Sequence, residues 1–339
     1  MTQVRIGKKV PRLSLDVEFR LEPGVTALFG PPASGKTLIL ECIAGFTRPE
    51  SGRILFDDTI LFDAESGVNV PPRRRACGYV FQHDSLFPHM TVRQNLVFAA
   101  KRWPRLERHR RVSESLDRFQ LTAQAAGRPS DLTPPQTLLA SIARALIGEP
   151  KLLLLDDRAI DEPLLRQIRA IYTCPILLVT RDLDLVCAAA GQLIVLEGGR
   201  ILQAAAPRKV LDEPASVEAA RLLGIPNLLE CTIKRLDPGR NSSLLEFEHF
   251  ELSGPYIPAQ FRGGRVWVAI DAQALRVHGA DPPANSVAMQ LVRTTQLTHS
   301  IRLEFSNSIF VDLSRDEFER QKDNEKWWVE FPPESLHIL

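Results

Sequence analysis

One short segment of the sequence has the residue types and spacing of a phosphate-binding loop. Residues 30–37 read GPPASGKT, which fits the pattern G-x-x-x-x-G-K-[ST]. The backbone N–H groups of such a loop surround phosphate oxygens, and the dipole of the helix that follows favours negative charge. Lys36 would reach the β- and γ-phosphates, and Thr37 would place its hydroxyl on Mg²⁺. The segment predicts a nucleotide-phosphate site formed by Gly30, Pro31, Pro32, Ala33, Ser34, Gly35, Lys36 and Thr37.

The elements expected around this loop are a strand that enters it and a helix that leaves it. VTALFG (25–30) predicts a buried strand, and KTLILECIAGF (36–46) has the pattern of a helix. Apolar strands are also expected within 151–157, 175–180 and 191–203, with helical patterns between them. Strands that alternate with helices predict an α/β domain with a largely parallel sheet.

The pattern changes after about residue 225, where short strands are separated by turn residues. This part predicts a small all-β barrel or sandwich. We therefore expect two domains, a nucleotide-binding α/β domain over 1–225 and a C-terminal β-domain over 226–339.

The bulk composition is ordinary for a globular protein. The 339 residues are 44% hydrophobic and 24% charged, and the formal net charge of +1 gives no reason to expect a nucleic-acid partner. No secretory signal and no apolar run near the roughly 20 residues of a membrane span is evident. The five cysteines are scattered, which favours buried or incidental thiols in a reducing compartment. We expect a cytosolic chain that reaches a membrane only through a partner.

A carboxylate is expected beside the phosphate loop. The apolar run KLLLLDD (151–157) places Asp156 at the end of a strand, where it can hold Mg²⁺ through water. An apolar run followed by aspartate is a weak signal by itself, and it lies about 120 residues after the loop, a spacing unlike that of small GTPases.

The segment GYVFQHDSLFPHMTVRQNL (78–96) is similar to the Q-loop segment of ABC transporter ATPases. This resemblance implies that Gln82 contacts Mg²⁺ and the attacking water, and that the 82–92 segment receives the coupling helix of a membrane permease. GFTRPESGRILFDDTILFD (45–63) and VNVPPRRRACGYVFQ (68–82) most resemble importers of molybdate or sulfate. The C-terminal residues resemble the β-domain with which those importers pair as dimers and can sense the transported oxyanion.

The signature motif of the family departs from its usual form. Leu-Ser-Gly-Gly-Gln corresponds here to LTPPQ, which is Leu132, Thr133, Pro134, Pro135 and Gln136. In an ABC dimer this segment offers a hydroxyl and N–H groups to the γ-phosphate held by the partner. Thr133 keeps a hydroxyl, whereas the two prolines have no N–H to donate, although they suit the start of a helix. A helix N-terminus unrelated to phosphate is the alternative interpretation.

Two further positions depart from the family at the site of chemistry. The residue after the strand-ending aspartate is normally a glutamate that polarises water, and here it is the shorter Asp157. A misplaced base loses much of the roughly 10²–10⁴-fold that general base catalysis provides. Arg181 stands where the family has histidine, and it can touch a γ-phosphate but cannot share a proton with the base. The catalytic candidates are therefore Asp157, Gln82 and Arg181, with slow hydrolysis expected.

Taken together, the resemblance implies ATP and Mg²⁺ as cofactors, with the metal near Thr37, Gln82 and Asp156. It implies a permease partner and a dimer, formed either with a second copy or with another ABC subunit. The function predicted is that of the ATP-binding subunit of an ABC importer, for an oxyanion such as molybdate or sulfate, at the inner face of the cell membrane. The alternative is a non-hydrolysing or very slow nucleotide-dependent scaffold of the same architecture.

Overall fold

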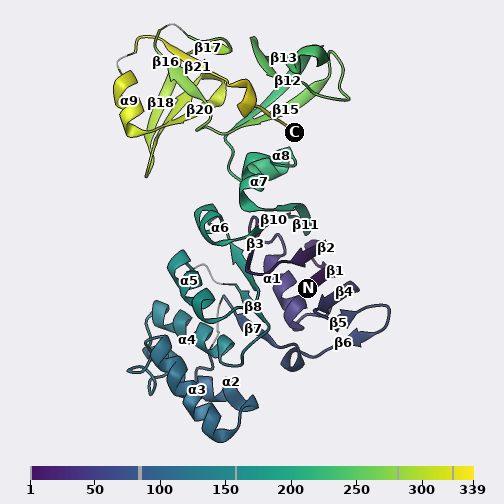
Figure 1. Cartoon of the computed structure of the whole chain (residues 1–339), viewed down its shortest axis with the longest axis vertical. Helices are drawn as coiled ribbons and strands as arrows, with labels where there is room; N and C mark the ends of the chain where they lie inside the picture. The colour runs from purple at the N-terminus through teal and green to yellow at the C-terminus, as the bar shows by residue number, and fades with distance from the viewer. Residues whose placement is uncertain (1, 83–85, 157–158, 281, 323) are drawn as a thin grey trace. The chain divides into compact units, whose positions relative to one another are not determined.

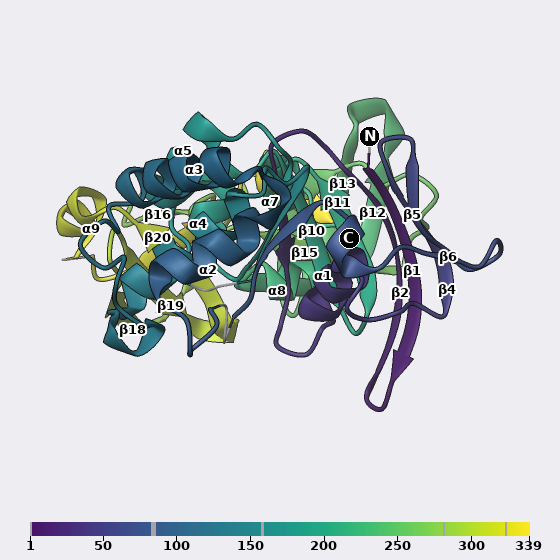
Figure 2. The same cartoon turned by 90° about the horizontal axis from the view of Figure 1, so that it is seen from below.

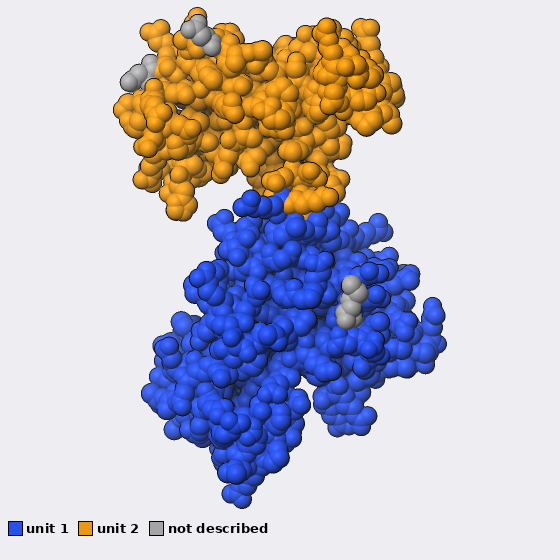
Figure 3. Space-filling model, viewed as in Figure 1, with its two compact units in different colours: residues 1–208 blue, residues 209–339 orange. Residues whose placement is uncertain are grey.

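The chain divides by its contacts into two compact units. The computed structural model describes residues 2–82, 86–156, 159–280, 282–322 and 324–339 (Figure 1). Unit 1 comprises Met1–Arg208 and unit 2 comprises Lys209–Leu339 (Figure 3). No helix in these described ranges has the length and apolarity needed to cross a bilayer.

The contact division falls earlier in the chain than the predicted domain boundary at 225–226. Helix α7 (Pro207–Asp212) crosses the division, and α8 (Val217–Leu222) packs against two strands of unit 2, β12 (Asn227–Asp237) and β15 (Arg265–Ile270). These helices precede the first strand of the C-terminal sheets. The boundary at 225–226 therefore stays a prediction of where a separate β-domain would begin.

The described part of unit 1 is built on an eleven-stranded mixed sheet in the order β6-β5-β4-β1-β2-β11-β10-β3-β9-β8-β7. Its strands are β1 (Thr2–Val10), β2 (Leu13–Leu21), β3 (Val25–Phe29), β4 (Ser51–Phe56), β5 (Thr59–Asp63), β6 (Val68–Asn69), β7 (Cys77–Val80), β8 (Leu152–Leu155), β9 (Ile176–Thr180), β10 (Gln192–Glu197) and β11 (Arg200–Ala205). Strands β10, β3, β9, β8 and β7 are parallel, whereas β1, β2, β4, β5 and β6 form an antiparallel half. The expectation of a largely parallel sheet was correct for only one half.

The burial patterns of the strands distinguish the parallel half of the sheet from the antiparallel half. The parallel strands β3 and β8 are buried at every residue, as expected for strands covered on both faces. Strand β2 instead alternates buried and exposed residues, because its outer face meets solvent. Such alternation identifies a half-buried strand but carries no information about the direction of its neighbours.

Helices cover the parallel half on both faces (Figures 1 and 2). They are α1 (Lys36–Ala44), α2 (Val92–Ala99), α3 (Arg105–Arg118), α4 (Pro134–Leu146), α5 (Glu162–Ile171) and α6 (Leu183–Ala189). Successive residues of a strand point to opposite faces. Accordingly, Leu153 and Leu155 join the core formed with α2, α3, α4 and α5, while Leu152 and Leu154 join the core formed with α1. This arrangement confirms the predicted α/β fold.

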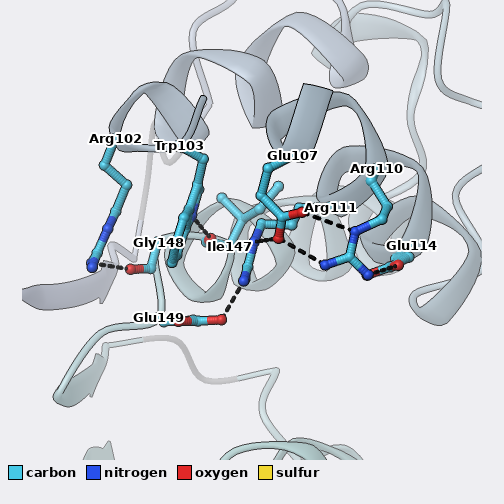
Figure 4. Close-up of polar contacts among 9 residues, drawn as sticks. All are labelled: Arg102, Trp103, Glu107, Arg110, Arg111, Glu114, Ile147, Gly148 and Glu149. Carbon is cyan, nitrogen blue, oxygen red and sulfur yellow. Dashed lines mark hydrogen bonds and ion pairs between the residues drawn. The ribbon is translucent and has the colours of Figure 1, made fainter. Parts of the chain in front are cut away.

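A polar cluster ties the start of α3 to the loop between α4 and β8 (Figure 4). Arg102 and Trp103 donate to main-chain carbonyls of this loop at 2.6 Å and 3.3 Å. Arg111 pairs with Glu149 of the same loop, and its guanidinium lies 3.7 Å from the centre of the Trp103 ring. The cluster fixes the end of α4, whose first residues form the predicted signature segment.

The described part of unit 2 confirms the expected all-β architecture. It has three antiparallel sheets, in the orders β14-β13-β12-β15-β22, β16-β21-β17 and β18-β19-β20. Outside the sheets, α8 precedes the first strand of the unit and α9 (Arg315–Gln321) follows β20. The remaining strands are β13 (Ser242–Phe247), β14 (Phe250–Pro255), β16 (Arg276–His278), β17 (Ser286–Met289), β18 (Leu291–Gln296), β19 (Ile301–Phe305), β20 (Ile309–Leu313), β21 (Trp327–Glu330) and β22 (His337–Ile338). One hydrophobic core contains residues of all three sheets, among them Leu229, Leu303 and Val329.

Candidate nucleotide-phosphate site

The GPPASGKT loop connects β3 to α1, as predicted. Its first and last glycines are required by close packing. A Cβ atom on Gly30 would lie 2.1 Å from the main-chain oxygen of Leu196, and one on Gly35, where φ is +106°, would lie 3.0 Å from Leu15. Glycine at both positions therefore lets the loop press against β10 and β2.

The middle of the loop holds a strained residue and a buried cation. Ala33 has a φ of +61°, a left-handed conformation that is unfavourable for a residue with a Cβ atom. Lys36 is only 9% exposed, and its ammonium donates to the main-chain oxygens of Gly30 (2.8 Å) and Pro31 (2.6 Å) and to Ser34 Oγ (3.1 Å). The loop thus folds around the charge that the motif assigns to phosphate binding.

Residues from four separate parts of unit 1 meet at this loop in a cavity of about 510 Å³. Lys36 and Thr37 come from the start of α1, and Gln82 follows β7. Asp156 and Arg181 follow β8 and β9. Parallel strands bring side chains at their carboxyl ends to one edge of the sheet, which is the usual position of a ligand in an α/β fold. The structure therefore brings together five residues predicted from motifs that are far apart in the sequence.

The cavity also has walls that no motif indicated. They are formed by Val10, Arg12 and Leu13 at the turn between β1 and β2, by Glu41 of α1, and by Val179 and Thr180 of β9. The turn residues carry no pattern in the sequence, because their role comes only from the pairing of β1 with β2. Glu41 has the spacing of an ordinary helix residue, and its carboxylate accepts a hydrogen bond from Thr47 at 2.8 Å.

The donor set suits a nucleotide phosphate with Mg²⁺. It combines an ammonium, an exposed hydroxyl at Thr37, an exposed amide at Gln82 and a carboxylate at Asp156 that is 5% exposed. Hard oxygen ligands and one or two carboxylates are what Mg²⁺ takes in phosphate sites. The pKa of Tyr79 is raised, first by burial and second by the negative charge of Asp156. Asp156 itself is buried and lines the cavity, where a carboxylate is suited to hold a metal.

One catalytic candidate, Asp157, lies outside the described residues, and its assignment stays a prediction. Arg181 is exposed at the end of β9 and lines the cavity. The catalytic roles of Arg181 and Gln82 stay predictions.

The predicted permease-contact segment 82–92 is described from Leu86 onward. Its loop is fixed by Asn95, which is fully buried and which sequence reasoning missed. Asn95 Oδ1 accepts a hydrogen bond from the N–H of Phe87 at 2.8 Å, and Nδ2 donates to the carbonyls of Phe87 (3.2 Å) and Met90 (3.3 Å). Phe87 in turn meets the 40% exposed Phe98 edge to face. A rigid loop with exposed aromatic surface is suited to contact another protein.

The signature segment forms the N-terminus of α4. Thr133 is the residue before the first helical turn, Pro134 and Pro135 begin the helix, and the N–H of Thr133 donates to Gln136 Oε1 at 2.9 Å. These residues do not line the chain's own phosphate cavity. The alternative of an ordinary helix start therefore stays open beside a role at a partner's nucleotide.

A larger cavity, of about 890 Å³, lies at the opposite ends of the same strands. Lys151, before β8, and Pro175, before β9, are among the residues that line it. Its lining has a lysine, hydroxyls and carboxylates, but the described residues that line it include no glycine and so no counterpart of the glycine-rich loop. On the chemistry of the lining, rather than on volume, the smaller cavity is the candidate nucleotide site.

Comparison with known proteins identifies the family of this chain. The ABC transporter family model matches residues 15–159. A molybdenum import ATP-binding protein of Paramagnetospirillum magneticum is 30% identical over 291 residues, which cover 83% of this chain and 78% of that protein. This chain belongs to the ABC transporter ATP-binding family. The corresponding protein of Rhodospirillum rubrum is 35% identical over 223 residues, so this chain matches 60% of that relative's length.

Solved structures of this family support the fold of the nucleotide-binding part. The cbiO1 protein of Clostridium perfringens, part of an ABC transporter complex, aligns with a TM-score of 0.53 and 25% identity over 65% of this chain and 94% of that one. The ATP-binding cassette MJ0796, solved as a dimer with ADP and phosphate, aligns with a TM-score of 0.52 at 21% identity over 61% of this chain and 99% of that one. The second likeness supports the fold alone.

Proposed function

We propose that this chain is the ATP-binding subunit of an importer for an oxyanion of the molybdate type. The observation that carries the proposal is the cavity in which Lys36, Thr37, Gln82, Asp156 and Arg181 meet at the carboxyl ends of parallel strands. Relatives named for molybdenum import, 30% to 36% identical over 62% to 83% of this chain, favour that cargo.

In this role, each of these five residues has one task. The loop and Lys36 hold the β- and γ-phosphates of ATP, while Thr37, Gln82 and Asp156 surround Mg²⁺. When bound, the metal supplies positive charge that neutralises the phosphates. Arg181 adds a fixed cation at the open side of the cavity, where it is exposed.

The partners follow from the same proposal. The loop around Phe87, held by Asn95, contacts a membrane permease, and the chain lies at the cytoplasmic face of the membrane through that contact. Two ATP-binding chains close on ATP, as a homodimer or with another ABC subunit. Unit 2 contributes to pairing through its β-sheets.

A second candidate function is a nucleotide-dependent scaffold that hydrolyses ATP very slowly. The observation that favours it is the start of α4, where Pro134 and Pro135 occupy the first helical positions and offer no N–H to a phosphate. Asp157 and Arg181 in place of the family's glutamate and histidine add to it. A homodimer would have two impaired sites, and pairing with an intact paralogue would leave each site with one impaired half.

The deciding experiment measures ATP binding and single-turnover hydrolysis separately, with the permease reconstituted in vesicles and molybdate uptake followed in parallel. Tight Mg·ATP binding, uptake of molybdate and slow turnover are the expected results. Turnover at rates typical of the family, abolished by Lys36→Ala, would exclude the scaffold. Binding of ATP without any uptake of molybdate or sulfate would exclude the importer of oxyanions.

A further inference from the structure

A buried cation in unit 1 lies outside the phosphate cavity. Arg75 precedes β7 and is only 2% exposed. Its Nε donates to the carbonyl of Val70 at 2.7 Å, Nη1 donates to the carbonyls of Cys42 (2.8 Å) and Ile43 (2.9 Å), and Nη2 donates to Asn69 Oδ1 at 2.8 Å. All three nitrogens of the guanidinium are therefore hydrogen-bonded to neutral oxygens.

Within the part of the chain that the structure describes, the hydrogen-bond acceptors around this cation are neutral oxygens. None of the ion pairs among the described residues involves Arg75, and burial lowers the pKa of its guanidinium. A buried charge needs compensation, and here the compensation comes from α1. Cys42 and Ile43 lie in the last turn of that helix, where carbonyls have no intrahelical donor and the helix dipole is negative. Arg75 thus completes the C-terminal end of α1.

Space for the guanidinium is kept open by a glycine. Gly45 ends α1 with a φ of +86°, and a Cβ atom there would lie 2.5 Å from Arg75 Nε. The backbone of the helix end and the side chain of Arg75 therefore fit together as one unit.

The two elements joined by this contact both lead to the phosphate cavity. The N-terminal end of α1 carries Lys36 and Thr37. The whole helix is nine residues long, so the contact with Arg75 at its other end is only about two turns away. Strand β7 begins two residues after Arg75 and leads to Gln82. A shift of α1 relative to β7 would change the distance between the lysine–hydroxyl pair and the amide on the opposite wall.

We propose that Arg75 is a positioning residue for the nucleotide site, which locks the C-terminal end of α1 to the segment that enters β7. The lock sets Lys36 and Thr37 against Gln82 in the geometry that Mg·ATP requires. The proposal rests on the proposed function only for the identity of the ligand, because the lock itself is present in the free chain.

The test uses a graded series of variants of the full chain. Arg75→Met removes the charge and all the hydrogen-bond donors. Arg75→Lys keeps the charge but loses the planar guanidinium that donates in several directions. Asn69→Ala removes one acceptor of Arg75, and Asn69 is an exposed residue. Hydrogen exchange of the nucleotide-free chain is expected to show lost protection in residues 30–46 in all three variants, least in Asn69→Ala. Mg·ATP affinity is expected to fall about tenfold in Arg75→Lys and about twofold in Asn69→Ala. ATP affinity in EDTA should fall less than Mg·ATP affinity.

A matched control separates positioning from general loss of stability. Arg302→Met removes a guanidinium that donates to Asp312 at 2.7 Å in unit 2, so it should destabilise unit 2 and leave Mg·ATP affinity unchanged. Unchanged exchange in residues 30–46 of Arg75→Lys and Asn69→Ala would overturn the proposal, as would equal losses of affinity with Mg²⁺ and with EDTA. A wild-type chain that binds no ATP would instead overturn the proposed function, while the exchange data would still decide the role of Arg75.

Discussion

Two helices of unit 1, α1 and α4, begin with segments that are predicted to meet phosphate, and they differ in what their first turns can donate. At the start of α1, glycine-rich backbone leads into Lys36 and Thr37, which keep their N–H groups. At the start of α4, Thr133 precedes two prolines that have none. Both segments form well-defined helix starts. The comparison indicates that starting a helix and binding an anion at its N-terminus are separable properties.

The physical reason lies in the unpaired N–H groups of a first helical turn. A helix leaves about four such groups without an intrahelical partner, and these groups are what a phosphate uses. Proline at the first positions removes donors that would otherwise need partners, so it stabilises the start of α4. The same substitution deprives a ligand of its hydrogen bonds. The start of α4 therefore forms a helix without these N–H donors, whereas the start of α1 forms a helix and retains them.

The largest effect is expected at α1. Lys36→Ala should weaken Mg·ATP binding about 100-fold, or about 2.7 kcal/mol, because it removes a buried charge-assisted donor to the phosphates. Lys151→Ala, at the opposite end of β8, is the matched control and should bind ATP as the wild type does. Titration calorimetry measures both variants. Equal binding by Lys36→Ala and wild type would mean that the phosphate site lies elsewhere.

A second prediction concerns a double variant that gives the start of α4 the N–H donors that the start of α1 has. Pro134→Ser combined with Pro135→Gly returns two N–H groups to the start of α4, and ATP-dependent dimer formation should tighten about tenfold, since a hydrogen bond to a charged group contributes about 1.5–3 kcal/mol. Pro163→Ala, in the first turn of α5, is the control and should change nothing. Sedimentation velocity with and without ATP measures the effect. A monomer under both conditions, with helix content retained, would favour an ordinary helix start.

Alkaline pH should lower the stability of unit 1 through thiols in and near α1, whereas α4 contributes no thiol to this effect. Burial raises the pKa of Cys42 in α1 and of Cys77 in β7 to about 12 each, and α4 contains no thiol. An unfolded thiol ionises near pH 8.5, so above that pH the unfolded chain holds fewer protons than the folded chain and stability falls. Each buried thiol should cost about 1.4 kcal/mol per pH unit up to its folded pKa.

Denaturant unfolding at pH 7.5, 9 and 10 measures this slope. Cys42→Ala should make the decline above pH 9 shallower by the contribution of one thiol, with no effect at pH 7.5 beyond that of the lost side chain. A decline of equal steepness in the variant would show that Cys42 ionises in the folded chain.

The smallest effect concerns backbone strain, which the loop before α1 has at Ala33 (φ +61°) and which Thr133 before α4 lacks (φ −70°). Ala33→Gly should stabilise the chain by about 0.5 kcal/mol, because relief of a left-handed conformation exceeds the entropy lost by the more flexible glycine. Ala99→Gly at the end of α2, where φ is −68°, should instead destabilise it. Thermal unfolding of both variants shows whether each substitution raises or lowers the midpoint temperature.

Motifs in the sequence predicted the fold class, the phosphate loop and most residues that line the cavity. Lys36 and Thr37 were identified from spacing, Asp156 from the end of an apolar run, and Gln82 and Arg181 from a resemblance. These signals could be recognised because each depends on a few consecutive residues. The mixed character of the sheet was missed, since alternation within β2 does not reveal whether its neighbours run parallel or antiparallel.

The sequence by itself determined what depends on neighbours along the chain: the glycine-rich turn, the buried strands, the loss of N–H donors at Pro134 and Pro135, and the membership of a family of nucleotide-binding chains. Tertiary structure alone decided which residues far apart in the sequence come together at the cavity or hydrogen-bond to each other. Arg12 and Glu41 meet at the cavity, Asn95 fixes the loop of Phe87, and Arg75 closes a helix end 32 to 33 residues away. Long-range hydrogen bonds of this kind depend on strand order and helix packing, which arise from burial of the whole core and leave no local pattern to read.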